Sequence, residues 1–482
     1  MTDHLEAQAT RFSQSETVEH QPLSRKIFFA TILATSLGFV LVQLDVSIVN
    51  VALAEISNDL RTGIAGLQWV VDSYTLLFAS LLLLAGTLAD QIGARKAFVG
   101  GFGLFVMASL ACGFAPDSTV LIVARVIQGI GAAFLVPCSL ALLNHACRGN
   151  AMMRARAIGL WTASGSVSLA VGPVLGGFLV HALSWRSIFF INLPLGIIGV
   201  WLTLRFVEES STRSGHRFDI AGQILAIGAL ASLTAAMIEA STLGWLSPLV
   251  LLGFVIAAIC GIAFVLVEAR VRAPMLPLNF FRNSTFSAAI LVGLAINLTL
   301  YGIIFVLSLY LQQIRHFSPL TFGVAFLPLP LVLLVSNLSS GWLGGRVGSR
   351  PLMVTGLIIA ALGYWLLHDL KPETSYAALL SGLLILPLGI GLAVPAMTTA
   401  LLAAVPRSRS GIASGVLNTV RQAGGAIGVA LFGSFLAQSG VGGIQNAFVT
   451  SCVVVAIAAV IAFLRIRPMS ETQTDRPQER LD

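Results

Sequence analysis

Long apolar runs separated by short polar segments make up most of the chain. A helix needs about 20 mostly apolar residues to cross the ~30 Å hydrocarbon layer of a membrane. Fourteen runs approach or exceed that length, and none shows the two-residue alternation of membrane-barrel strands. We therefore predict an all-α polytopic membrane protein with fourteen transmembrane helices. The runs are centred on residues 28–52, 66–86, 98–115, 118–142, 157–181, 188–206, 220–239, 249–268, 285–310, 321–343, 351–368, 375–400, 411–436 and 446–464.

The positions of the basic residues indicate how the chain is oriented. If the amino terminus is cytoplasmic, 22 of the 28 Lys and Arg residues lie on the cytoplasmic side, 4 on the opposite side and 2 inside spans. Cytoplasmic loops of membrane proteins carry such an excess of Lys and Arg. One missed helix would invert every later loop and remove the bias. The distribution therefore predicts fourteen spans with both termini cytoplasmic.

The composition excludes other classes of protein. Hydrophobic residues make up 56% of the chain, charged residues make up 10%, and the mean hydropathy is +0.91. A water-soluble protein needs more polar surface than this, so a soluble enzyme, a nucleic-acid-binding protein and a disordered chain are excluded. The net charge of +7 follows from the topology. The 5 cysteines show no metal-ligand spacing, and we expect no metal and no cofactor.

Two polar segments divide the chain, at 208–217 and 269–285. They bracket the seventh and eighth spans, which predicts six helices, two extra helices and six more, as in transporters with internal repeats. The predicted domains are a cytoplasmic tail (1–26), an N-terminal six-helix bundle (27–207), a linker with two helices (208–284), a C-terminal six-helix bundle (285–466) and a second tail (467–482).

No nucleotide-driven or hydrolytic motif is present. The lysines are Lys26, Lys96 and Lys371, and none stands in a GxxxxGK[ST] phosphate loop. HExxH and GxSxG are also absent. We therefore expect no enzymatic activity, and energy from an ion gradient, a substrate gradient or a partner subunit.

Two ionisable residues of opposite charge lie at matching depth in the predicted spans. Asp45 in the first span and Arg125 in the fourth each lie ~12–15 Å below the outer end of their helix, at 1.5 Å per residue. A lone charge at that depth costs several kcal/mol, so pairing is the cheapest solution. The pair is either a static salt bridge that holds the bundle or a proton-responsive pair.

Other polar residues in the spans are candidates for a substrate cavity. Asp72 lies near Trp69 and Tyr74, and an acid beside aromatic rings could meet a flat cation, or could simply belong to an outer vestibule. Arg421 lies near the midplane without an acidic partner in the last six helices, close to Asn418 and Gln422. It could pair with an anion, a backbone carbonyl or the first half.

Six ordered motifs resemble the major facilitator superfamily, and within it the 14-helix drug:proton antiporters of the EmrB/QacA type. The resemblance spans about residues 28 to 466. The motifs are Leu44 to Leu53 in the first span, Gly86 to Lys96 after the second, Arg125 to Gly131 in the fourth, Gly172 to Gly177 in the fifth, Trp185 to Pro194 before the sixth, and Gly411 to Gly425 in the thirteenth.

The resemblance implies alternating access between two six-helix bundles, with proton entry driving expulsion. It implies that Asp45 and Arg125 serve proton coupling. It also implies a conformational latch after the second span and a leak-limiting motif in the fifth. The latch comprises Gly86, Asp90, Gly93, Arg95 and Lys96, and the motif of the fifth span comprises Gly172, Pro173, Gly176 and Gly177.

The function favoured by the sequence is proton-coupled export of lipophilic, cationic drugs or biocides. A dedicated exporter of one endogenous metabolite or toxic organic acid stays open, since Arg421 permits anionic cargo. A non-transporting receptor would need a sensing domain, which we do not find. We expect a monomer in the bacterial cytoplasmic membrane, with small-molecule substrates, protons and lipid as partners and no nucleic acid. A periplasmic adaptor stays open.

Overall fold

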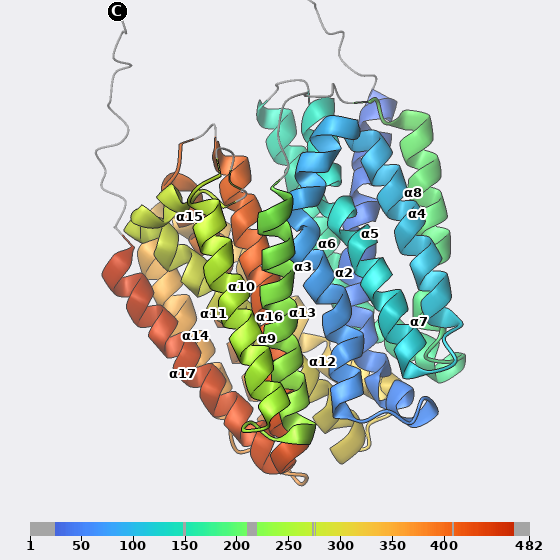
Figure 1. Cartoon of the computed structure of the whole chain (residues 1–482), viewed down its shortest axis with the longest axis vertical. Helices are drawn as coiled ribbons and strands as arrows, with labels where there is room; N and C mark the ends of the chain where they lie inside the picture. Colours follow the sequence, from blue (N-terminus) through green and yellow to red (C-terminus); the bar gives the residue numbers. More distant parts are fainter. Residues whose placement is uncertain are drawn as a thin grey trace, which may run out of the picture.

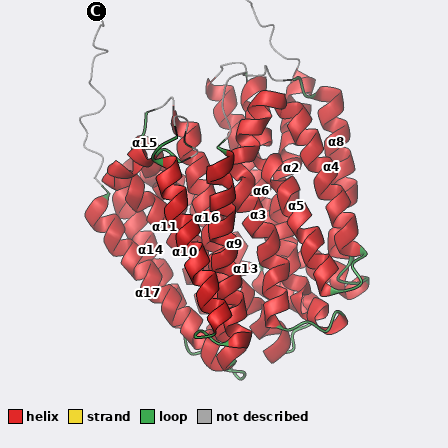
Figure 2. Ribbon diagram, viewed as in Figure 1, coloured by secondary structure: helices red, strands yellow, loops and turns green. Residues whose placement is uncertain are grey.

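The structure, a computed structural model, describes residues 25–147, 151–209, 219–271, 274, 276–406 and 409–466. Every regular element in these segments is helical (Figures 1 and 2). Within them, 14 helical spans are long and apolar enough to cross a membrane. Each predicted run coincides with one of these spans, so the predicted all-α class is confirmed.

The first half of the chain forms six spans. They are α2 (Arg25–Asp59), α3 (Ile64–Ile92), α4 (Ala94–Gly113), α5 (Ser118–Ala146), α6 (Ala151–Ala182), and the pair α7 (Ser187–Phe190) and α8 (Asn192–Phe206). The first span continues to Asp59, beyond the predicted end near residue 52.

Two extra helices and six further spans follow. They are α9 (Ile220–Leu243) and α10 (Pro248–Glu268), then α11 (Ser284–Leu309) with its π-helical extension η2 (Tyr310–Ile314), the pair α12 (Pro319–Phe326) and α13 (Pro328–Val347), α14 (Ser349–Leu366), α15 (Tyr376–Ala403), α16 (Ser410–Ser439) and α17 (Val441–Arg465). A short 3₁₀ helix, η1 (Leu278–Arg282), precedes α11.

Corresponding helices of the two halves are joined in the same way. Gly93 alone separates α3 from α4, and Gly348 alone separates α13 from α14. Both glycines have positive φ, 97° and 84°, which glycine adopts without the steric cost that a Cβ brings. These matching joints fit a chain built from two similar halves.

The halves meet along pairs of helices. Helix α3 packs against α16, α6 against α12, and α2 against α11. Helix α9 contacts both α3 and α16, and α10 packs on α9, so the extra pair covers one side of the seam (Figure 1). Only 6% of the residues in the most apolar stretch of α10 are buried, which suits a helix that faces lipid.

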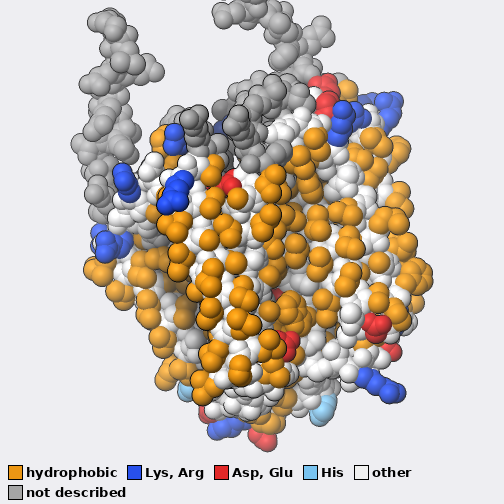
Figure 3. Space-filling view, viewed as in Figure 1, with side chains coloured by type: hydrophobic (Ala, Val, Ile, Leu, Met, Phe, Trp, Pro, Cys, Tyr) orange, Lys and Arg blue, Asp and Glu red, His pale blue; other side chains and the backbone are white. Residues whose placement is uncertain are grey.

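The ends of the bundle match an even number of crossings. Helix α2 begins and α17 ends at the same end of the molecule (Figure 1). Hydrophobic side chains cover the flank between the two ends, and Lys and Arg side chains gather mainly at the end where α2 begins (Figure 3). Which end is cytoplasmic stays a prediction. The predicted tails 1–26 and 467–482 lie almost entirely outside the described residues.

Candidate functional site: a buried ion pair and an apolar cleft

Asp45 and Arg125 form an ion pair inside the first bundle. The Arg125 Nη1 atom donates to Asp45 Oδ2 over 2.5 Å, and the two side chains are 1% and 0% exposed. The Arg125 Nε atom donates to the carbonyl of Val70, and its guanidinium lies 4.2 Å from the ring centroid of Tyr74. The predicted pairing of α2 with α5 is therefore present in the structure.

A set of polar side chains surrounds the carboxylate. Gln128 Nε2 and Asn192 Nδ2 donate to Asp45 Oδ1 over 2.9 and 3.2 Å. The same two amides also donate to Ser109 Oγ, and Gln128 Oε1 accepts from Arg125. Four transmembrane spans thus supply one connected network. Such a network stabilises a buried charge only while its groups are satisfied.

Glycines in α5 bring this network together. A Cβ at Gly129 would lie 2.5 Å from the carbonyl oxygen of Tyr74, and one at Gly131 would lie 2.8 Å from the amide of Phe105. Real Cβ atoms do not approach so closely, so α5 reaches α3 and α4 only because these positions are glycine. That approach places Arg125 and Gln128 within reach of α2.

Three residues of α3, Trp69, Asp72 and Tyr74, were predicted to line a substrate cavity, but their side chains have different surroundings. Asp72 is fully buried, and its two carboxylate oxygens have no hydrogen-bond partner among the described residues. Tyr74 stacks against Arg125, whereas Trp69 Nε1 lies 3.5 Å from Glu239 of α9. The three side chains therefore do not gather around one described cavity.

Arg421, the basic residue predicted for the substrate cavity, lies on α16. The side-chain stem of Arg421 packs near Gly293 of α11, where an added Cβ would lie 3.3 Å from its Cγ. Its Nε atom is buried without a hydrogen-bond partner among the described residues, although its charge interacts with Tyr301 of α11. Asn418 and Gln422 are partly buried on the same helix.

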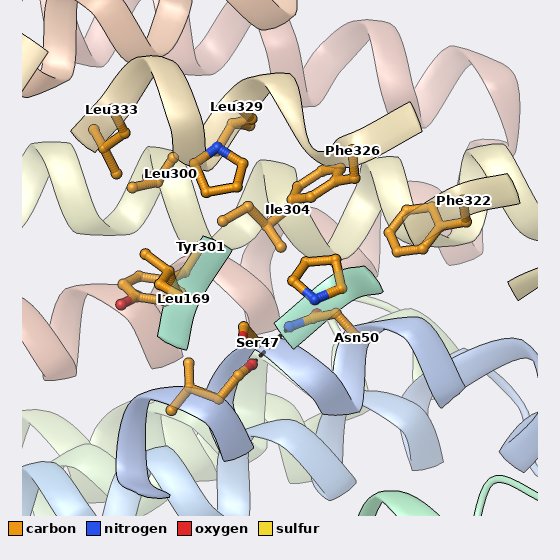
Figure 4. Close-up of a pocket in the computed structure, with 13 residues that line it drawn as sticks. Ser47, Asn50, Leu169, Leu300, Tyr301, Ile304, Phe322, Phe326, Leu329 and Leu333 are labelled. Carbon is orange, nitrogen blue, oxygen red and sulfur yellow. Dashed lines mark hydrogen bonds between the residues drawn. The ribbon is translucent and has the colours of Figure 1, made fainter. Parts of the chain in front are cut away.

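An apolar cleft opens between the two bundles (Figure 4). Its 13 lining residues come from α2 and α6 on one side and from α11, α12 and α13 on the other. The space between them measures about 510 Å³, including its open side. The lining contains none of the six residues predicted for the substrate cavity. Its polar members are Ser47, Asn50 and Tyr301.

Comparison with known proteins identifies the family. The model of the Major Facilitator Superfamily matches residues 35–429 and 285–481. The chain belongs to the major facilitator superfamily. It is 40% identical over 407 residues to the multidrug resistance protein Stp of Mycobacterium tuberculosis, a match that covers 84% of this chain and 75% of Stp. It is 37% identical over 438 residues to the methylenomycin A resistance protein of Bacillus subtilis, covering 90% and 94%.

A solved structure shares the overall fold. A bacterial homologue of the human lysosomal transporter Spinster, solved in an inward-facing, unoccupied conformation, aligns with a TM-score of 0.66 at 18% identity. That alignment covers 92% of this chain and 97% of the other. The family match and the curated relatives confirm the predicted superfamily, so the protein is a membrane transporter.

The superfamily motif at the junction of α3 and α4, which the sequence placed after the second span, contacts its own bundle. Arg95 donates from Nε to the Thr203 carbonyl and from Nη2 to the Leu204 carbonyl, both in the last turn of α8. Its backbone amide donates to Glu209, 3.3 Å away. The side chain of Asp90 lies outside the described residues. Gly86 packs near Pro137 and Lys96 is exposed. A latch between the bundles stays a prediction for this motif.

The superfamily motif of α6 lies at two helix contacts. An added Cβ at Gly172 would meet Ser47 of α2, and one at Gly176 would meet Ile48. On another face of α6, Gly177 lies against the backbone of Pro319 in α12. The motif therefore packs α6 both on the helix that carries Asp45 and on the second bundle. Its predicted role in limiting leak is untested.

Sequence reasoning gave no role to several residues that the structure places in these sites. Asn192 and Ser109 complete the network around Asp45, while Asn50 and Tyr301 line the cleft. The sequence marked each of these residues only as a polar side chain inside an apolar run. The sequence alone does not show which face of a helix such a residue occupies, and that face decides its partner.

Proposed function

We propose that this transporter is a proton-coupled antiporter that exports lipophilic drugs, cationic ones among them, by alternating access. Its relatives support drug export, since they are named a multidrug resistance protein, a methylenomycin A resistance protein and, at 36% identity in Mycobacterium tuberculosis, the drug efflux pump JefA. Their membership of one superfamily with this chain supports a shared mode of transport.

The observation that carries proton coupling is the buried network around Asp45. Three donors hold one carboxylate from which solvent is excluded. A proton added to Asp45 would remove the negative charge that these donors compensate, and Arg125 would then need another partner. Arg125 also donates to the Val70 carbonyl of α3, the helix that packs on the second bundle. Reorientation of the Arg125 side chain would therefore alter a contact with α3.

The energy available suits this role. One elementary charge crossing a membrane potential of 100 mV releases about 2.3 kcal/mol. One or two protons in each cycle would therefore support concentration of a substrate on the far side. No further cofactor is required by this scheme.

Asp72 is the residue proposed to meet cationic cargo. It is a buried carboxylate without a described partner, and a ligand cation would supply the missing opposite charge. The topology proposed with this scheme places both termini in the cytoplasm and the protein in the bacterial cytoplasmic membrane. Extrusion would then run from the cytoplasm or inner leaflet outward.

The test compares two aspartates of the same helix in reconstituted vesicles. Asp45 and Asp59 each pair with an arginine, but the Asp59–Arg186 pair lies at the helix end with side chains 48% and 33% exposed. We expect Asp45→Asn to abolish ethidium-induced proton release and uphill efflux, whereas Asp59→Asn keeps both within twofold. Full uphill efflux by Asp45→Asn vesicles would overturn proton coupling at Asp45.

A further inference from the structure

One end of the second bundle carries an excess of positive charge. From residue 269 to residue 470 the chain has only two acidic residues, Asp369 and Glu373. Both belong to the segment that joins α14 to α15, at the end of the bundle remote from the start of α14. An end with charges of one sign attracts anions. The described arginines of this end, where α14 begins and α17 ends, are Arg270, Arg282, Arg346, Arg350, Arg409 and Arg465.

Two of these arginines flank the joint between α13 and α14. Arg346 lies in the last turn of α13 and Arg350 in the first turn of α14. The Arg346 guanidinium lies 3.8 Å from the ring centroid of Trp342, and that of Arg350 lies 4.7 Å from the ring centroid of Phe463 in α17. Neither guanidinium has a hydrogen-bond or carboxylate partner among the described residues. Both therefore have N–H donors available to a further ligand.

The corresponding arginine of the first bundle is engaged within its own chain. Arg95 and Arg350 occupy the same position, the second residue after the glycine of each joint. The guanidinium of Arg95 donates to two carbonyls in the last turn of α8, and its amide donates to Glu209. Helix α17 packs on α14 as α8 packs on α4, but Arg350 meets the ring of Phe463 there. The first bundle thus supplies acceptors to its arginine, whereas the described part of the second bundle supplies none.

The aromatic rings beside these arginines lie on lipid-facing surfaces. Trp342 is 62% exposed and continues a stripe of exposed apolar side chains along α13. The other members of the stripe, at helical spacing, are Leu331, Val335 and Leu338. Phe463 is exposed on α17 in the same way. Aromatic rings of this kind are typical of the membrane–water interface, the level of the lipid headgroups. A phospholipid would cover these rings with its acyl chains, whereas a soluble phosphate would leave them bare.

We propose that Arg346 and Arg350 bind the phosphate of an anionic phospholipid on the lipid-facing side of the α13–α14 joint, with Trp342 and Phe463 against its acyl chains. A guanidinium matches a phosphate through two parallel hydrogen bonds and is weakly hydrated, so it gives up water readily. With the topology proposed above, this lipid belongs to the anionic cytoplasmic leaflet. The site goes beyond drug export, because it gives the second bundle a lipid partner at the joint where the first bundle binds its own chain.

The experiment follows the fluorescence of Trp342 in the full chain, reconstituted in neutral phosphatidylcholine. Brominated acyl chains quench a tryptophan only at short range, so the probes are brominated phosphatidylglycerol and brominated phosphatidylcholine. Each protein is compared with the same protein carrying Trp342→Phe, and the difference isolates the signal of this ring. The variants are Arg346→Gln and Arg350→Gln. Arg205→Gln is the control, because it removes the same charge from the last turn of α8, one turn after the exposed Trp201.

We expect brominated phosphatidylglycerol to quench Trp342 at a mole fraction at least about tenfold lower than brominated phosphatidylcholine does, and each of the two variants to raise that mole fraction about fivefold, the effect of one basic residue near an anionic surface. Arg205→Gln should leave it within twofold. Arg346 is exposed, so the fold does not depend on it, and Arg346→Gln decides the test if Arg350→Gln fails to fold.

Three results would overturn the lipid site. They are equal quenching by the two brominated lipids in the unmodified protein, unchanged quenching in Arg346→Gln, and a loss in Arg205→Gln as large as that in Arg346→Gln. Reversal of the quenching by millimolar glycerol 1-phosphate would replace the lipid with a soluble phosphate as the ligand, and so would also overturn the proposal. No gradient and no drug is present in this measurement, so its failure would leave the proposed export function untouched.

Discussion

Gly323 of α12 lies directly against the carbonyl group of Pro173 in α6, so that an added Cβ would come closer than 3.0 Å to the carbonyl oxygen. The contact joins the two bundles beside the cleft. We predict that Gly323→Ala forces α6 and α12 apart at a cost of about 1–3 kcal/mol, the usual penalty for overpacking. Efflux should fall at least about fivefold, and the thermal unfolding midpoint should fall as well.

The control for this prediction is Gly341→Ala in α13. No atom lies within 4 Å of an added Cβ at that position, so the same methyl group meets open space. Efflux by Gly341→Ala should match the unmodified protein. Equal activity of the two alanine variants would show that the α6–α12 contact does not control transport.

Asn192 is expected to stabilise the protein mainly through Asp45. Removal of its amide takes one donor from the buried carboxylate, which should cost about 1–3 kcal/mol. We predict that Asn192→Ala lowers the thermal unfolding midpoint strongly in the unmodified background and weakly in the Asp45→Asn background. The difference measures the coupling between the two residues.

Asn297→Ala provides the comparison for that cycle. Asn297 is also buried, but its amide donates within its own helix to the Gly293 carbonyl. Its effect on the midpoint should be the same in both backgrounds. If the midpoint shift caused by Asn192→Ala is also the same in both backgrounds, Asn192 does not stabilise the protein through Asp45.

Hydropathy and charge were sufficient to predict the spans because the membrane imposes a length on each apolar run. The Asp45–Arg125 pair was also predictable, since two opposite charges at equal depth have few alternatives to pairing. Both inferences depend on position along the membrane normal. The place of a residue within its apolar run gives this depth directly.

Lateral position was not predictable in the same way. Trp69, Asp72 and Tyr74 stand within one and a half turns, yet Trp69 approaches α9 while Tyr74 contacts Arg125 of α5. The 13 residues that line the cleft come from five helices. Four of them lie in the motifs of α2 and α6, but no motif marks the residues of α11, α12 and α13 that face them. Their juxtaposition follows from how the helices pack, which a single sequence does not specify.

Asp72 should affect cationic substrates more than neutral ones. We predict that Asp72→Asn lowers ethidium efflux at least about tenfold, because it removes the negative charge proposed to meet the cation, and leaves efflux of the uncharged dye Nile red within twofold. Initial rates in the same vesicles provide the measurement. Equal losses for both probes would make Asp72 a structural residue.

Gln68 links the bundles at α3 and α16, where its Nε2 atom donates to the carbonyls of Ala430 and Val429 over 2.7 and 3.1 Å. Its Oε1 atom is buried without a described partner. Leu at this position would remove the hydrogen bonds together with the unpaired acceptor, while the two carbonyls, which lie inside α16, keep their intrahelical hydrogen bonds. Glu would instead place acceptor oxygens against two carbonyls in a buried site.

We therefore predict that Gln68→Glu lowers the thermal unfolding midpoint and efflux far more than Gln68→Leu does. An isosteric exchange would thus be more harmful than an apolar one, because a buried charge facing two acceptors is unfavourable by several kcal/mol. Gln313→Glu is the control, since Gln313 is exposed on η2, and it should change neither quantity. Similar midpoints for Gln68→Glu and Gln68→Leu would mean that solvent reaches this contact, and that the α3–α16 seam opens in the resting protein.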